Sequence, residues 1–247
     1  MSALAPSVDS AEVEKFAKLA EQWWDPQGSF APLHKFNPVR LRFIRDVVAE
    51  HFSRDARSIR PFEGLSLLDL GCGGGLLSEP MARLGFAVTG LDAAERNVRI
   101  ANAHALRTGV TVRYRSGTAE ALTTESAAFD VVLNMEVVEH VADVGEFLAT
   151  SAALIKPGGL TFVATLNKTA KSFALAKIGA EYILRWLPAG THDWNRFIAP
   201  RDLCASLTDA GLTVLKVQGV MFDPFAWAWK LSADTDVNYM VVAGRQP

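Results

Sequence analysis

The 247-residue sequence contains only two cysteines, Cys72 and Cys204, so it can form neither a disulfide framework nor a four-cysteine metal site. It has no run of about 18 uncharged apolar residues, and therefore no candidate membrane-spanning helix. No basic segment followed by an apolar core begins the chain, so no secretory signal is predicted. A formal net charge of −2 provides no broad basic surface for nucleic acid. These absences predict a cytoplasmic protein that does not bind nucleic acid.

Short apolar runs alternate with segments of helical spacing along most of the chain. Strands are predicted at 65–71, 86–92, 110–117, 129–136, 160–167, 212–220 and 237–244. Strands that alternate with helices in this way form βαβ units and a parallel sheet. The sequence therefore predicts an α/β fold with a Rossmann-like, doubly wound sheet of seven mostly parallel strands.

We expect a single domain over 1–247, because neither a linker nor a repeat divides the chain. The expected parts are a helical lid (11–60), a cofactor-binding core (61–167), a substrate or membrane insertion after the fifth strand (168–200), and a closing helix and strands (201–247).

A glycine-rich segment, LLDLGCGGG, joins the first predicted strand to the helix after it. Gly71 and Gly73 let the backbone pass close to a ligand at a helix N-terminus. Asp92, which ends the second strand, can accept hydrogen bonds from ribose hydroxyls. The dinucleotide fingerprint G-x-G-x-x-G fails, since Leu76 or Ser78 stands in place of its third glycine, and no lysine completes a phosphate-binding loop. The pattern predicts a nucleoside-containing cofactor.

This segment has the form D-x-G-x-G-x-G and is similar to the first motif of class I S-adenosylmethionine-dependent methyltransferases. Several other segments make the chain resemble the ubiquinone-biosynthesis O-methyltransferases from about residue 11 to its end. They are 16–44 (with WWD and N-P-x-R), 135–141, 190–203 and 237–243.

The resemblance implies S-adenosyl-L-methionine as cofactor and a polyprenylated catechol or hydroquinone as substrate, methylated on a phenolic hydroxyl. It implies cofactor contacts at Arg40, Gly71, Asp92 and Met135, and a place in a ubiquinone-biosynthesis complex. Two alternatives stay open. One is O- or C-methylation of another small phenol or quinone, and the other is a scaffold that keeps the fold without catalysis.

Glu136, Glu139 and His140 follow the fourth predicted strand, in NMEVVEHV, and would share one face of a helix. Methylation needs a phenolate, and only about one phenol in a thousand is ionised at neutral pH when its pKa is about 10. The three side chains are therefore candidates for catalysis, either as ligands of Mg²⁺, Mn²⁺ or Zn²⁺ or with His140 as a metal-free base. A polar helix start without a catalytic role is the third alternative.

His192, beside Asp193, is a second candidate base or substrate contact, and a loop histidine bonded to its neighbours is the alternative. A helix predicted over 168–187 carries a wide apolar arc. It either packs on the sheet or binds an anionic membrane surface. The second hypothesis predicts a peripheral protein on the inner face of the membrane, where a polyprenylated substrate resides.

Overall fold

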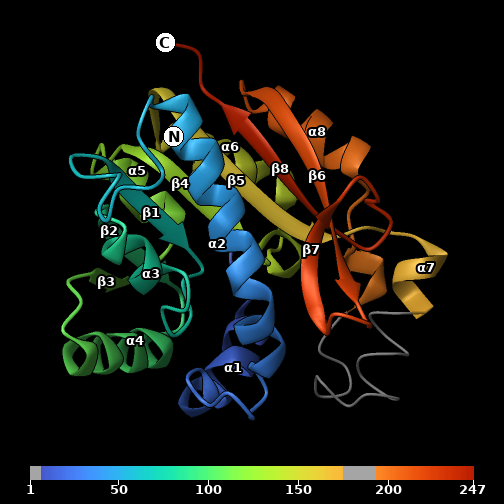
Figure 1. Ribbon diagram of the computed structural model, residues 1–247, viewed down its shortest axis with the longest axis horizontal. Helices are drawn as coiled ribbons and strands as arrows, with labels where there is room; N and C mark the ends of the chain where they lie inside the picture. The colour runs from blue at the N-terminus through green and yellow to red at the C-terminus, as the bar shows by residue number, and fades with distance from the viewer. Residues whose placement is uncertain (1–6, 175–192) are drawn as a thin grey trace.

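The computed structural model describes residues 7–174 and 193–247 (Figure 1). Its centre is an eight-stranded sheet of order β3-β2-β1-β4-β5-β8-β6-β7. The strands are β1 (Ser66–Leu70), β2 (Ala87–Asp92), β3 (Arg113–Ser116), β4 (Phe129–Met135), β5 (Ile155–Leu166), β6 (Thr213–Asp223), β7 (Ala228–Ser232) and β8 (Asn238–Gly244). β1 to β5 run parallel, and β6, β7 and β8 pair antiparallel. The predicted doubly wound, mostly parallel fold is confirmed.

The sheet has one strand more than the seven predicted. The additional strand, β7, pairs antiparallel with β6 from Gly219↔Ser232 to Asp223↔Ala228 and forms the edge of the sheet. Its sequence escaped prediction because none of its five residues is fully buried, so it lacks the buried face that marks a strand.

The helices lie on both faces of the sheet. They are α1 (Ser10–Lys18), η1 (Ala20–Gln22), α2 (Ala31–His51), α3 (Ser78–Arg83), α4 (Glu95–Thr108), α5 (Ala119–Thr124), η2 (Val138–His140), α6 (Val144–Ala153), α7 (Ala170–Ser172), η4 (Trp194–Arg196) and α8 (Pro200–Asp209). None of the described helices has both the length and the hydropathy needed to cross a bilayer.

Two apolar layers hold the helices against the sheet. On one face, α2 buries Phe43, Ile44 and Val48 against strand residues such as Leu67 and Phe162. On the other face, side chains of α5, α6 and α8 pack against β1, β4, β5 and β8. Within the segment predicted as a lid, α2 thus forms part of the core, whereas α1 lies beyond the end of α2 in Figure 1.

The strand order reverses between β1 and β4, which are neighbours although β2 and β3 come between them in the chain. Leu70 pairs with Asn134, so β1 and β4 end at the same level of the sheet. In open parallel sheets, ligands bind beyond the carboxyl ends of the strands at such a switch point. The glycine-rich segment and NMEVVEHV both begin there.

Candidate active site

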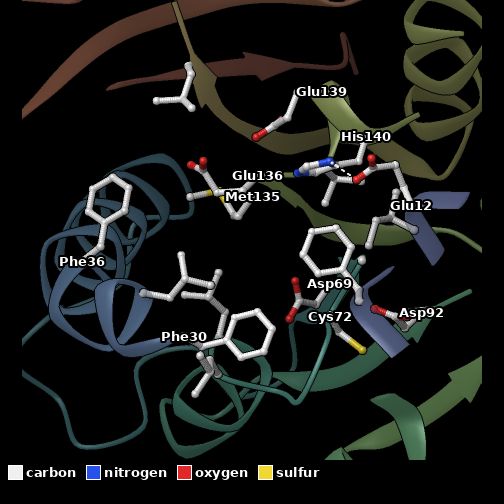
Figure 2. A pocket seen from close by; sticks show the side chains of 18 of the residues that line it. Glu12, Phe30, Phe36, Asp69, Cys72, Asp92, Met135, Glu136, Glu139 and His140 are labelled. Carbon is white, nitrogen blue, oxygen red and sulfur yellow. Dashed lines mark hydrogen bonds and ion pairs between the residues drawn. The ribbon is translucent and has the colours of Figure 1, made fainter. Parts of the chain in front are cut away.

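A cavity of about 1040 Å³ lies beyond these strand ends. Figure 2 shows Glu136, Glu139 and His140 along one wall, with Asp69 and Asp92 along the other. Aromatic residues, among them Phe30 and Phe36, complete the lining. The cavity also contains all the predicted cofactor contacts except Gly73, namely Arg40, Gly71, Asp92 and Met135.

The glycine-rich loop has the backbone shape that only glycine adopts at low cost. Gly71 and Gly73 have φ angles of +67° and +54°. A Cβ atom on Gly71 would lie 2.6 Å from Cγ2 of Val137, and one on Gly73 would lie 2.4 Å from the ring of Trp23. The loop is therefore packed against the segment after β4 on one side and against the N-terminal region on the other.

Asp92 is held at the end of β2 by three donors. Its carboxylate accepts hydrogen bonds from the backbone N–H of Gly73 (2.9 Å), the backbone N–H of Ala94 (2.8 Å) and Nδ2 of Asn97 (3.1 Å). Burial nevertheless raises the pKa of Asp92 above its ordinary value. The carboxylate is fixed at the cavity wall, and its remaining lone pairs are available to the hydroxyls of a ribose.

The WWD motif attaches the N-terminal region to the glycine loop. The indole of Trp23 donates to Oδ1 of Asn97 at 3.0 Å and stacks on Phe30, with ring centroids 3.7 Å apart. The indole of Trp24 donates to the backbone carbonyl of Gly74 at 2.8 Å. In the N-P-x-R run that follows, Nδ2 of Asn37 donates to the carbonyl of Leu76. These contacts hold the N-terminal region against the glycine loop.

Arg40 lies inside the molecule, only 2% exposed, and its guanidinium is 2.7 Å from Oε1 of Glu136. The guanidinium also lies over the ring of Phe36, 3.9 Å from its centroid. Burial lowers the pKa of Arg40, and the charge of Glu136 opposes that shift. The pair joins α2 to the end of β4.

Glu136, Glu139 and His140 do not lie on one helix face. Glu136 has a φ of +60°, a left-handed turn that ends β4, and only a single 3₁₀ turn, η2, follows it. Because this turn interrupts the helical spacing, the prediction that the three side chains share a helix face is wrong. Among the described residues, no three His, Cys, Asp or Glu side chains come together in a metal-binding arrangement.

Glu139 is buried, and its Oε2 accepts a hydrogen bond from the hydroxyl of Thr165 at 2.9 Å. Burial raises the pKa of Glu139 to about 7, and the neighbouring charge of Glu136 acts in the same direction. Among the described residues, its second oxygen, Oε1, has no hydrogen-bond partner. A carboxyl group of this kind exchanges its proton near neutral pH.

The hydrogen-bond partner of His140 comes from near the N-terminus of the chain. Its Nδ1 is 2.9 Å from Oε2 of Glu12 on α1, and the edge of its ring meets Phe16 at a centroid distance of 5.0 Å. The bond to His140 lowers the pKa of Glu12 to about 2. Sequence reasoning missed Glu12, because a glutamate in an amphipathic helix resembles any solvated surface charge.

Three buried polar atoms of cavity-lining residues have no hydrogen-bond partner in the part of the chain that the structure describes. They are Oδ1 of Asn37, Nε of Arg40 and Oε1 of Glu139. Unpaired buried groups are costly, so a ligand that offers both donors and acceptors fits this cavity. Nε of Arg40 is thus available to donate to a carboxylate of a ligand.

The second candidate site lies partly outside the described residues. His192 and most of the predicted helix at 168–187 fall there. Asp193 is described, and its side chain caps η4 by accepting from the backbone N–H of Asn195. Of the insertion, residues 168–174 and 193–200 are described, and they contain the short helices α7 and η4.

Comparison with known proteins identifies the family. The model of a methyltransferase domain matches residues 36–217. The ubiquinone biosynthesis O-methyltransferase of Caulobacter vibrioides is 58% identical over 95% of this chain and 94% of its own length. The protein of the same name from Methylobacterium nodulans is 55% identical over 97% of this chain and 96% of its own.

Solved structures support the fold. Magnesium protoporphyrin IX methyltransferase from Synechocystis, crystallised with S-adenosylhomocysteine, superposes with a TM-score of 0.66 at 21% identity. The match covers 96% of this chain and all of the other. The fold, the glycine loop and the sequence identity to these relatives over nearly the whole chain all agree with the resemblance seen in the sequence. The chain belongs to the ubiquinone biosynthesis O-methyltransferase family.

Proposed function

We propose that this protein transfers a methyl group from S-adenosyl-L-methionine to a phenolic hydroxyl of a polyprenylated catechol or hydroquinone in ubiquinone synthesis. The observation that carries the proposal is that one cavity is lined by all the groups the reaction needs. It joins the glycine loop and Asp92 to His140 and Glu139, and it continues between apolar walls that include Phe36 and Trp229. A polar cofactor, an ionisable ring and an apolar tail each find matching side chains there.

Arg40, Gly71, Gly73, Asp92 and Met135 would hold the cofactor. The glycine loop offers close backbone approach, Asp92 accepts from ribose hydroxyls, and Nε of Arg40 donates to a carboxylate. Met135 presents a soft apolar surface in the cavity wall. When bound, the cofactor supplies an activated methyl group on a sulfonium.

The acceptor has to lose its proton, and His140 is the base that the geometry favours. The phenol gives its proton to Nε2 of His140. The phenolate would then take the methyl carbon that a bound S-adenosylmethionine would supply, and the bonding electrons would stay on the sulfur that leaves. Glu139, whose pKa burial raises to about 7, also lines the cavity. His192 stays a second candidate for contact with the substrate.

A divalent ion at Glu136, Glu139 and His140 is the alternative. In the described arrangement, Glu136 pairs with Arg40, Glu139 with Thr165 and His140 with Glu12. These separate partners do not fit a shared ion, so we derive no step through one.

A methylation assay on a short-chain prenylated catechol tests the proposal. We expect the labelled methyl group of S-adenosylmethionine to be found on a phenolic oxygen of the product. We expect the rate of methylation to be the same after chelation, once removal of metal has been verified. Absence of product would contradict the function. Product on carbon would favour C-methylation, and loss of activity on chelation, restored by Mg²⁺, Mn²⁺ or Zn²⁺, would favour the metal alternative.

We further propose that the protein binds an anionic membrane surface, as predicted for 168–187. The described hairpin of β6 and β7 supports this, because Phe225 at its tip is fully exposed and Trp227 is 58% exposed. Other hairpin residues, Phe222 and Trp229, line the cavity. Lys171, at the start of the insertion, forms ion pairs with Asp234 and Asp236 in the turn after the hairpin, so both segments belong to one region.

Cavity size agrees with a membrane-bound tail. A volume of about 1040 Å³ is near the upper end for pockets that hold one drug-sized ligand. The same space has to hold a nucleoside cofactor and a phenol ring, so a long prenyl chain has to continue outside. The hairpin would place the exit of the tail at the bilayer.

Co-flotation with vesicles of phosphatidylcholine and phosphatidylglycerol tests this proposal. Replacing both Phe225 and Trp227 by Ser should weaken binding at least about tenfold, since burying one large apolar side chain contributes about 1.5–3 kcal/mol. The matched control replaces Ile59 and Leu106, which are 88% and 84% exposed elsewhere on the surface. Equal binding by both double variants would contradict the hairpin's role.

A further inference from the structure

The N-terminal helix contributes a charged group to the catalytic wall. Glu12 of α1 and His140 of η2 are 128 positions apart in the chain, yet Oε2 and Nδ1 are 2.9 Å from each other. Figure 2 shows their contact at the cavity wall, and the second ring nitrogen of His140 points away from Glu12 toward the interior. Both side chains are largely buried, at 20% and 15% exposed.

Other contacts fix the position of α1, so the placement of Glu12 does not depend on His140 alone. Val8 forms an antiparallel bridge with Val141, and the backbone N–H of Ala142 donates to the carbonyl of Ser7 at 2.8 Å. The side chain of Asp9 caps α1 by accepting from the N–H groups of its first turn. The same carboxylate pairs with Arg196 at 2.7 Å.

A carboxylate at Nδ1 has two consequences for a histidine. It holds the proton on Nδ1, which leaves the lone pair of Nε2 free to accept a proton, and it fixes the orientation of the ring. It also stabilises the imidazolium that forms when Nε2 takes the proton. Glu12 can do both, because it stays ionised throughout the physiological range.

We propose that Glu12 is a positioning residue that orients His140 as the base for phenol deprotonation. This rests on the proposed function, in which His140 receives the proton. Because Glu12 belongs to α1, the base is complete only when the N-terminal segment lies against the segment after β4.

The pH dependence of kcat distinguishes this role from a structural one. The charged groups that face the pair are Lys15 and Arg196 near Glu12, and Glu139 near His140. Glu12→Gln keeps the size of the side chain but removes its charge. Without that charge the imidazolium is less stable, so the acidic limb of the kcat profile should move to lower pH. Loss of ring orientation should lower kcat at least about tenfold.

Two further variants serve as controls. Glu12→Asp keeps the charge and should restore part of the rate and the normal profile. Arg196→Gln removes the ion pair with Asp9 that anchors the same segment. Because Arg196 bonds to Asp9 rather than to His140, this variant should move the kcat profile much less than Glu12→Gln does. Thermal unfolding of each variant verifies that the chain is folded.

The outcomes separate this inference from the function on which it rests. If His140→Gln retains wild-type kcat, then His140 is not the base and the proposed mechanism fails. If His140→Gln is inactive while Glu12→Gln has the wild-type rate and profile, only the role of Glu12 is overturned. The role of Glu12 would also be overturned if Glu12→Gln changed kcat and KM only as much as Arg196→Gln does and left the kcat profile unchanged.

Discussion

Gly73→Ala should separate the backbone cost of the glycine loop from the cost of displacing the N-terminal region. Gly73 has a φ of +54°, where a residue with a Cβ costs about 1–2 kcal/mol. The added Cβ would also lie 2.4, 2.5 and 2.9 Å from three ring atoms of Trp23. That ring cannot move freely, because it stacks on Phe30 and donates to Asn97.

The expected loss in the free energy of unfolding is therefore larger than the cost of placing a Cβ at a positive φ angle. Displacing the buried ring of Trp23 should cost about 2 kcal/mol more, the scale of burying one large apolar side chain. We expect Gly73→Ala to lower the free energy of unfolding by about 3–4 kcal/mol. Affinity for S-adenosylmethionine should fall at least tenfold, since the loop and Trp23 both line the cofactor region.

Gly109 provides a matched control, because its φ is +67° and an added Cβ there would have no atom within 4 Å. Gly109→Ala should cost only the backbone term and leave cofactor affinity unchanged. In a Trp23→Ala background, Gly73→Ala should also cost only that term, which corresponds to a coupling energy of about 2 kcal/mol. Urea unfolding and titration calorimetry measure both quantities. Additive losses, or equal losses for the two glycine variants, would refute the reasoning.

Two further predictions concern buried charges. Arg40→Met leaves Glu136 without its cation and should lower the free energy of unfolding by about 3 kcal/mol. The exposed pair of Arg45 with Asp46 should contribute less than about 1 kcal/mol, so an equal loss for Arg45→Met in urea unfolding would contradict the argument. Burial raises the pKa of Asp69 from 3.8 to about 7, so ionisation of this carboxyl group opposes folding. As pH rises from about 4 to 7, the free energy of unfolding of the wild type should therefore fall relative to that of Asp69→Asn, by up to about 4 kcal/mol. Urea unfolding across that range measures the difference, and a constant difference would be the contrary result.

Local pattern predicted most of the sheet and the cofactor loop. Strands such as β1 and β4 are mainly apolar because both of their faces are covered, and that composition is visible without a structure. Gly71, Gly73 and Asp92 were identifiable for a similar reason, since the fold fixes their spacing between consecutive elements. β7 was missed because an edge strand with no fully buried residue has no such pattern.

The sequence by itself determined the fold class, the cofactor loop and the family, because each depends on neighbours in the chain. Only the tertiary structure decided the partners of NMEVVEHV. The left-handed turn at Glu136 directs that side chain to Arg40, and the fold brings Glu12 to His140 from the far end of the chain. Pairings of this kind follow from how helices dock on the sheet, and no local periodicity encodes them.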